Sequence, residues 1–223
     1  YQEEPVERIA HRTSPTNIGM ALLANLAAYD FGYIHASELI ERTHSTLTTL
    51  NRLERYKGHF YNWYDTITLT PLYPRYVSTV DSGNLAGHLL TLRPGLIGLV
   101  EEPVVTVRLF EAIYDTCCLL KQALGQSGEQ INGFETLLEG ARRSNTSSLS
   151  EIGTHLVGLE GSAAKILLNL ILMCDPVRGI DQSEEVEIWA NALHQQCHAA
   201  LLELNMFSPW VQTQGFAKVV SVD

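Results

Sequence analysis

The chain has 223 residues, enough for one domain or for part of a larger one, and 45% of them are hydrophobic, an ordinary fraction for a globular protein. Its 15 basic and 25 acidic residues give a net charge of −10, which disfavours nucleic acid and anionic lipid as partners because like charges repel. The acidic residues are not gathered in blocks, so the pattern favours a solvated surface over an acidic tail.

The cysteines give no indication of a zinc site or a redox motif. The four are Cys117, Cys118, Cys174 and Cys197, and none of them belongs to a C-x-x-C pair. Neighbours such as Cys117 and Cys118 rarely form a framework disulfide. We therefore predict buried, reduced thiols in a cytosolic compartment.

No segment of the sequence has the pattern of a membrane span. The longest apolar run, Ala163–Cys174, contains Lys165 and Asn169 and is too short and too polar to cross a bilayer. The chain begins at Tyr1 without a signal-peptide pattern, so we expect a soluble fragment of a longer protein.

Helical periodicity runs through almost the whole chain and predicts an all-α fold. Ser14 followed by Pro15 is typical of an N-cap and a first helical position, so a helix is predicted from Pro15 to a break at Gly32. A second helix is predicted over Ala36–Arg55. The short connection between the two indicates an antiparallel hairpin.

A long segment without helical period, Tyr56–Val80, follows this hairpin. Loops of this length in a compact domain usually carry function, and a short strand is predicted at Ile67–Leu69. A helix is then predicted over about Ser82–Leu92, capped by Asp81 or Ser82, and it ends at the Arg93–Gly95 break.

Four further helices follow, so the sequence predicts about seven in all. They cover Val104–Leu124, Gly128–Arg143, Ser148–Met173 and Ser183–Met206. Residues 209–223 have no clear period, and an irregular tail is expected there. We thus divide one partial domain into motif-bearing residues 1–92, further helices over 93–208, and the tail. The succession of helix pairs is typical of a toroid of antiparallel helical hairpins.

Three clusters of polar and aromatic residues lie at helix N-termini or in loops that lead to them. They are Arg12–Gly19 (RTSPTNIG), Gly58–Thr66 (GHFYNWYDT) and Tyr76–His88 (YVSTVDSGNLAGH). Because alternate helices of such a toroid begin on the same rim, we expect the clusters to converge on one mouth. Aromatic planes beside paired donors and acceptors suit a sugar ring. The candidate substrate contacts are Arg12, Asn17, Tyr61, Asn62, Trp63, Tyr64, Asp65, Asp81, Asn84 and His88.

Other interpretations of these residues stay open. The aromatic residues can belong to a core, and Ser14 and Asp81 can be helix caps alone. Asp65 and Asp81 can also form a carboxylate pair, about 5 Å apart in a retaining glycosidase and about 6.5–9.5 Å apart in an inverting one. Asp81 is better interpreted as a carboxylate that binds substrate or supports the transition state.

The three clusters closely resemble motifs of cyclic β-1,2-glucan synthases, over a stretch that covers about a third of the chain. In that family the motifs belong to a central, glycoamylase-like domain that cuts a linear β-1,2-glucan and joins its ends by transglycosylation. The resemblance implies part of an (α/α)6 toroid that contributes to the glucan cleft. It also implies a multi-pass bacterial inner-membrane parent with this soluble segment on the cytoplasmic side, and no cofactor or metal here.

The resemblance further implies that the carboxylates that cut the glucan lie outside this chain. One family motif that carries them is a Ser-Glu-Ala-Arg stretch, which neither Ser183–Glu185 nor Ile188–Ala190 reproduces. We therefore assign no catalytic residue and expect the isolated chain to be inactive. The expected partners are a β-1,2-glucan chain and the rest of the parent polypeptide. The alternative is a helical structural or interaction module without sugar binding, able to form a homodimer through exposed helix faces.

Two histidines near the C-terminus have the spacing of a metal pair. His194 and His198 have the i, i+4 spacing of a metal pair, with Cys197 beside them. The acidic residue of an H-E-x-x-H pattern is missing, so we interpret them as histidines at the edge of an apolar stripe.

Overall fold

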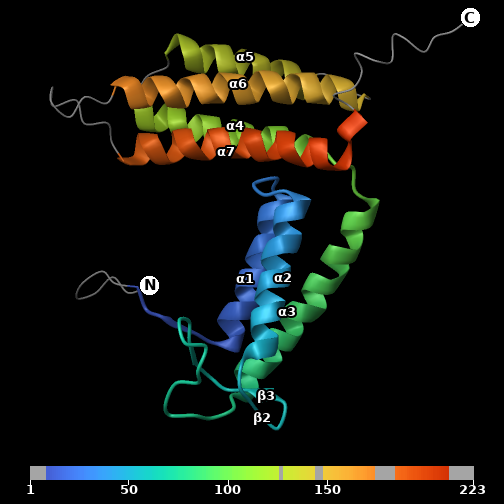
Figure 1. The fold of residues 1–223 in the computed structure, drawn as a ribbon, viewed down its shortest axis with the longest axis vertical. Helices are drawn as coiled ribbons and strands as arrows, with labels where there is room; N and C mark the ends of the chain where they lie inside the picture. The colour runs from blue at the N-terminus through green and yellow to red at the C-terminus, as the bar shows by residue number, and fades with distance from the viewer. Residues whose placement is uncertain (1–8, 126–127, 144–147, 174–183, 211–223) are drawn as a thin grey trace, which may run out of the picture. The chain divides into compact units, whose positions relative to one another are not determined.

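The computed structural model describes residues 9–125, 128–143, 148–173 and 184–210. These residues form seven α-helices, a 3-10 helix (η1) and four strands of two residues each (Figure 1). The predicted all-α fold is confirmed, while the toroid stays a prediction. The elements are β1 Arg12–Thr13, α1 Pro15–Asp30, α2 Ala36–Arg52, β2 Arg55–Tyr56, β3 His59–Phe60, β4 Tyr64–Asp65, α3 Thr79–Gly98, η1 Leu99–Glu101, α4 Val107–Leu124, α5 Glu129–Arg143, α6 Leu149–Met173 and α7 Glu184–Phe207.

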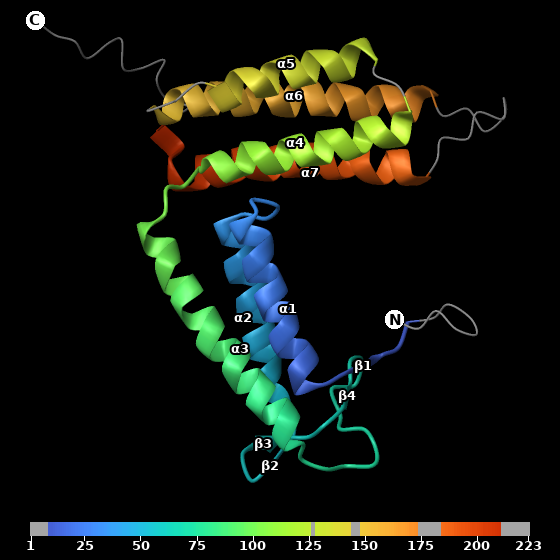
Figure 2. The ribbon, with the colours of Figure 1, turned by 180° about the vertical axis from the view of Figure 1, so that it is seen from behind.

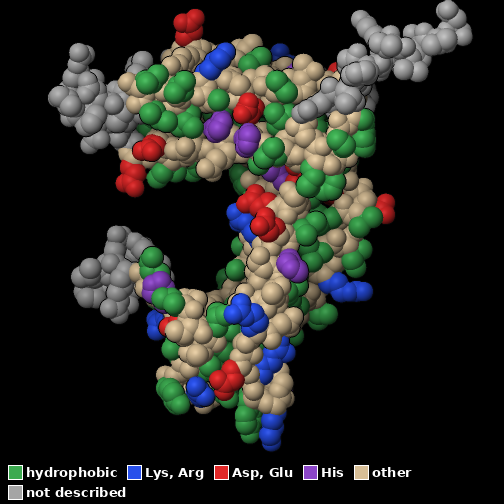
Figure 3. Space-filling model, in the orientation of Figure 1, with side chains coloured by type: hydrophobic (Ala, Val, Ile, Leu, Met, Phe, Trp, Pro, Cys, Tyr) green, Lys and Arg blue, Asp and Glu red, His purple; other side chains and the backbone are tan. Residues whose placement is uncertain are grey.

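The chain divides into two compact units. The first unit holds the residues up to Tyr29 and those of Ala36–Glu101, and the second holds Asp30–His35 and the residues from Glu102 onwards. On the face of the first unit shown in Figure 3, basic and acidic side chains are interspersed, as expected from a sequence without acidic blocks.

In the first unit, α1 and α2 run antiparallel, and α1 and α3 begin at the same end (Figure 2). The backbones of α1 and α3 approach closely at two glycines. A Cβ added to Gly19 would lie 2.3 Å from Nδ1 of His88, and one added to Gly95 would lie 2.6 Å from the side chain of Leu26. The small core beside these helices joins Leu50, Leu53 and Tyr64 to partly buried neighbours such as Ile18 and Leu69.

The first-unit loop is built from two short antiparallel pairings. Strand β2 pairs with β3 through a two-residue turn in which Lys57 and Gly58 both have positive φ, 48° and 88°, as a type I′ hairpin requires. Strand β1 pairs with β4, with Arg12 opposite Asp65 and Thr13 opposite Tyr64.

The strand predicted at Ile67–Leu69 is wrong. The backbone amides of Ile67 and Thr68 both donate to Oδ1 of Asp65, at 2.8 and 2.7 Å. Leu69 has a φ of 60°, which no strand accommodates. The segment is a tight turn because the Asp65 carboxylate offers its amides a local acceptor.

The end predicted for the third helix is also wrong, because α3 continues through Pro94 to Gly98. The ring of Pro94 removes one backbone donor, but the packing of Gly95 on Leu26 and the burial of Leu92 hold the helix together across it. The helix also begins earlier than predicted. Its N-cap is Ser78, whose Oγ accepts the backbone N–H of Asp81 at 3.1 Å.

In the second unit, α4 to α7 form a four-helix bundle in which each helix packs on two others: α4 on α5 and α7, and α6 on α5 and α7. Leucines at helical spacing fill its core, as the sequence predicts. One polar pair is buried among them, with the hydroxyl of Thr116 on α4 donating to Oε1 of Gln196 on α7 at 2.9 Å.

The thiols of Cys117, Cys118 and Cys197 are free. Cys117 and Cys197 are buried, as predicted, whereas Cys118 is only partly buried, and Cys174 lies outside the described residues. Burial raises the pKa of Cys117 and of Cys197 to about 12, so both are neutral packing groups.

Helix α6 differs from the expectation drawn from the shorter run Ala163–Cys174. Among the described residues, one segment, Leu149–Leu172, is long and apolar enough to cross a membrane by length and composition, with a mean hydropathy of 1.3. Its inner face, with Leu156, Leu159 and Ala163, packs in the bundle core.

Candidate functional site

The three sequence clusters lie together at the end of the first unit where α1 and α3 begin. The first cluster joins the second through the β1–β4 pairing. It joins the third through Thr16, whose hydroxyl donates to Oδ1 of Asp81 at 2.6 Å. The second joins the third through the backbone N–H of Asn62, which donates to the carbonyl of Tyr76 at 2.9 Å. The three clusters are therefore adjacent, as expected, while the mouth of a toroid around them stays a prediction.

One face of the β1–β4 ribbon carries an aromatic ring and two charges. Successive strand residues point to opposite faces, so Arg12, Trp63 and Asp65 share one face, while Thr13 and Tyr64 share the other. The guanidinium of Arg12 lies over the Trp63 ring, 5.4 Å from its centre. This face of the ribbon thus carries an indole, a guanidinium group and a carboxylate.

The carboxylate of Asp65 is fixed by the turn that follows it. The amides of Thr68 and Ile67 donate to it and are the main reason that its pKa is below the ordinary value. Asp65 is consequently an ionised acceptor at neutral pH, in a geometry set by the backbone.

Asp81 lies in the first turn of α3, surrounded by hydroxyl groups. Desolvation acts to raise its pKa, but hydrogen bonds from Thr16, Ser78 and Ser14 outweigh it, and the pKa is lowered. The Thr16 hydroxyl also accepts from Nδ2 of Asn84 at 3.1 Å. Thr16 therefore bridges two candidate contacts, a role that sequence reasoning missed. The sequence signal for this role is a threonine in the first turn of α1, two residues after Ser14.

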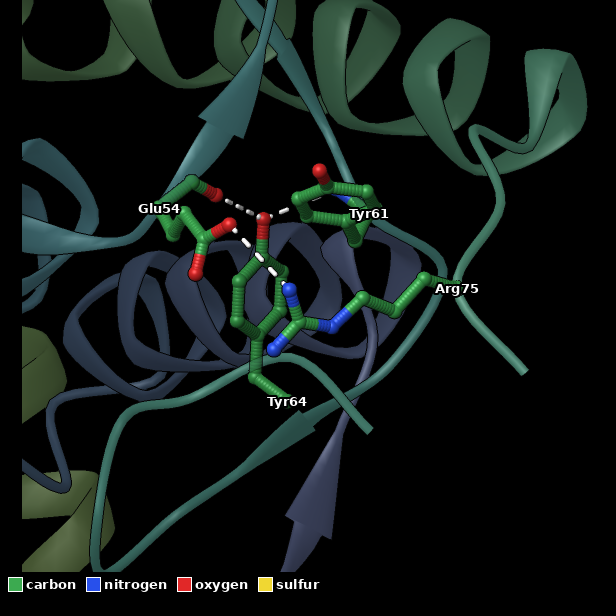
Figure 4. A network of polar contacts seen from close by, with 4 residues as sticks. All are labelled: Glu54, Tyr61, Tyr64 and Arg75. Atoms are coloured by element: carbon green, nitrogen blue, oxygen red, sulfur yellow. Dashed lines mark hydrogen bonds and ion pairs between the residues drawn. The ribbon is translucent and has the colours of Figure 1, made fainter. Parts of the chain in front are cut away.

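Tyr64 is fully buried, and its hydroxyl has two backbone partners (Figure 4). It donates to the carbonyl of Glu54 and accepts from the N–H of Tyr61, both at 2.8 Å. The Arg75 guanidinium closes this network from outside, 3.4 Å from Oε1 of Glu54. The ring of Tyr64 therefore supports the loop from inside and offers no exposed contact on the Trp63 face of the ribbon.

Two other candidates also have structural roles. Asn62 is 3% exposed, and its Oδ1 is buried without a partner. His88 packs against Gly19 with its Nδ1 buried and unpartnered, so it fixes the approach of α3 to α1. The remaining candidates are partly or fully exposed at the same end of the unit. They are Arg12, Asn17, Tyr61, Trp63, Asp65, Asp81 and Asn84.

In the second unit, His194 and His198 stack with ring centres 5.9 Å apart, beside Glu160 of α6. Oε1 of Glu160 lies 3.7 Å from His194 Nε2 and 3.4 Å from His198 Nδ1. No three His, Cys, Asp or Glu side chains of the described part of the chain are placed to hold a metal ion. The pair contacts a neighbouring helix through a shared carboxylate.

No family model matches the chain. The chain is similar to the cyclic beta-(1,2)-glucan synthase NdvB of Rhizobium meliloti (strain 1021), with 36% identity over 218 residues. The match covers 91% of this chain and 8% of NdvB. The resemblance drawn from the three clusters is therefore confirmed and extends well beyond them: the chain is related to a segment of a cyclic β-1,2-glucan synthase.

Proposed function

From this relationship we propose that the first unit contributes part of the glucan-binding cleft of a domain that cyclises linear β-1,2-glucan by transglycosylation. The observation that carries the proposal is the meeting of Trp63, Arg12, Asp65 and Asp81 at one end of the unit. The chain then acts as a segment of a larger bacterial polypeptide, on the cytoplasmic side of the inner membrane.

The chemistry of these groups suits a neutral sugar chain. The indole of Trp63 offers an apolar plane on which the C–H face of a glucosyl ring can stack. Arg12 brings donors for ring hydroxyls beside that plane, and Asp65 and Asp81 bring charged acceptors, which form stronger hydrogen bonds than neutral ones. Asn84, held by Thr16, adds an amide at the rim.

The same groups support binding better than acid catalysis. A general acid needs a pKa near the working pH, and glycosidase acids have raised values. Both Asp65 and Asp81 have lowered pKa values and stay ionised. We therefore assign them to substrate contact and assign no catalytic residue to this chain.

The alternative function is a helical structural or interaction module without sugar affinity. It is favoured by the structural roles of Tyr64, Asn62 and His88, three of the residues predicted to touch substrate. The homodimer predicted through exposed helix faces stays a prediction.

A titration with linear β-1,2-glucan oligomers, followed by tryptophan fluorescence, distinguishes the two functions. We expect a saturable change that is lost in Trp63→Phe, which removes the reporting indole, and in Asp81→Ala. Trp189→Phe, in the second unit, is the matched control and should keep the change. An unchanged spectrum at millimolar sugar would leave only the structural module.

A further inference from the structure

A cavity of about 290 Å³ lies in the first unit on the face of the β1–β4 ribbon opposite to Arg12 and Trp63. Thr13 and Tyr64, which point to that face, line it from the ribbon side. Helix α2 lines it from the other side. None of the residues predicted from the sequence as ligand contacts lies in it except Tyr64 and Asp65.

Five of the eleven residues that line this cavity are serine or threonine, in a lining that is mainly apolar. Ser45, Thr46 and Thr49 come from one side of α2, and Thr13 and Thr66 come from β1 and the loop after β4.

The floor of the cavity is apolar. Leu50, Leu53 and Tyr64, which form it, belong to the buried core of the first unit, and Ile18 and Leu69 complete the wall. An apolar floor bordered by serine and threonine residues complements a sugar ring, whose faces are C–H groups and whose edge is hydroxyl groups.

The charge of the lining narrows the class of ligand. Asp65 is the one charged residue that borders the cavity, and no Lys, Arg or His lines it. The Asp65 carboxylate points to the other face of the ribbon, so the lining offers an anionic ligand no cation to pair with, and phosphates and carboxylates are disfavoured. The volume lies at the lower end of the range for small-molecule sites, which suits one ring and not a chain.

The rim of the cavity is formed before any ligand arrives. The Asp65 N–H donates to the Thr70 carbonyl at 2.9 Å, and the Leu69 N–H donates to the Asp65 carbonyl at 3.0 Å. These bonds close the turn that holds Leu69 in its left-handed conformation against the cavity. Little ordering entropy is lost when such a preformed site is filled.

We propose that this cavity holds one glucosyl ring of the β-1,2-glucan, as a second contact point on the opposite face of the ribbon from Trp63. The inference rests on the proposed function. A glucan long enough to reach both faces gains affinity from the linkage of the two contacts, and a short one does not.

The test compares substitutions on α2 by calorimetric titration of the full chain with linear β-1,2-glucan oligomers. Thr49→Leu fills the cavity, and Thr48→Leu, one position away and outside the lining, is the matched control. We expect Thr49→Leu to weaken binding of long oligomers by roughly tenfold, to the level of the disaccharide, while Thr48→Leu binds like the wild type. Thr49→Val, which removes the hydroxyl at constant shape, replaces Thr49→Leu if that variant does not fold, with weakening in the same direction.

The two proposals fail in different ways. Wild-type binding that is kept in full by Thr49→Leu and Thr49→Val overturns the cavity assignment and leaves the proposed function standing. Equal weakening by Thr48→Leu overturns it as well. The absence of binding by the wild type overturns both proposals.

Discussion

Asp81 is held by the side chains of three neighbouring hydroxyl residues, and this environment decides which protonation state it keeps. Its lowered pKa makes it a permanent acceptor for a sugar hydroxyl and a poor proton donor at neutral pH. Asp65 reaches the same state by another route, through the backbone amides of its own turn.

The lowered pKa of Asp81 predicts a pH dependence of stability. Because the folded value lies below the ordinary value of about 3.9, the ionised carboxylate stabilises the fold above about pH 4, and this contribution is lost as the pH falls through the folded-state pKa. We expect Asp81→Asn to lower the free energy of unfolding by about 1–3 kcal/mol at pH 7. The difference should shrink steadily below about pH 4. Parallel pH profiles of the two proteins in urea unfolding would contradict this.

At the residue scale, the sequence predicts which side chains gather but not which of them face outward. Arg12, Trp63, Asp65 and Asp81 were found from residue type and position before helix N-termini. The burial of Tyr64 was not, because strand alternation leaves open which face of the ribbon meets the core. Thr16 was missed because its partners come from a helix more than sixty residues away.

The helices of the first unit depend on close approach at glycines. Gly19 and Gly95 of the α1–α3 contact face the side chains of His88 and Leu26 directly. Such contacts also explain why Pro94 does not end α3, since tertiary packing outweighs local propensity. Helix existence was predictable from periodicity, and this helix end was not, because the partner of Gly95 cannot be identified from local sequence.

Gly19→Ala should be destabilising, by about 1–3 kcal/mol, because a methyl group placed 2.3 Å from His88 Nδ1 forces the two helices apart. Gly83→Ala is the control. That position on α3 has open space around it, and alanine favours a helix over glycine by about 1 kcal/mol, so the control should be more stable than the wild type. Hydrogen exchange of the α1 and α3 amides measures both effects, and an equal effect of the two substitutions would refute the close contact.

The bundle of the second unit contains one polar pair that can be tested in the same way. Thr116→Val leaves Oε1 of buried Gln196 without its donor and should cost about 1–3 kcal/mol. Thr136 on α5 is exposed and donates to the Asn132 carbonyl of its own helix, so Thr136→Val should change stability by less than about 0.5 kcal/mol. Thermal unfolding of both variants provides the comparison. Equal shifts in melting temperature would mean that the buried hydrogen bond contributes no more to stability than the exposed one.

At the scale of the whole molecule, the sequence predicts an all-α chain and its relationship to cyclic β-1,2-glucan synthases, and both are confirmed. The division into a hairpin-based unit and a four-helix bundle was not predictable. Helical periodicity shows that each helix has an apolar face, but it does not say which other helix covers that face.

The purified chain is expected to release no new reducing ends from linear β-1,2-glucan, because both carboxylates of the candidate site stay ionised and cannot donate a proton. A reducing-end assay over a range of pH tests this. Release that is abolished by Asp81→Asn would instead identify Asp81 as part of a catalytic pair.

Binding of β-1,2-glucan is proposed for the end of the first unit where α1 and α3 begin. The most direct measurement is a titration of the full chain with linear β-1,2-glucan oligomers, with β-1,3-glucan oligomers of equal length as the linkage control, read from the amide resonances of residues 12–17, 61–66 and 78–88. We expect saturable shifts with β-1,2-glucan only, confined to those segments and the cavity residues of α2, and we expect these shifts to be lost in Asp81→Ala. Shifts that are absent at millimolar sugar, or that are spread equally over the second unit, would contradict the proposal.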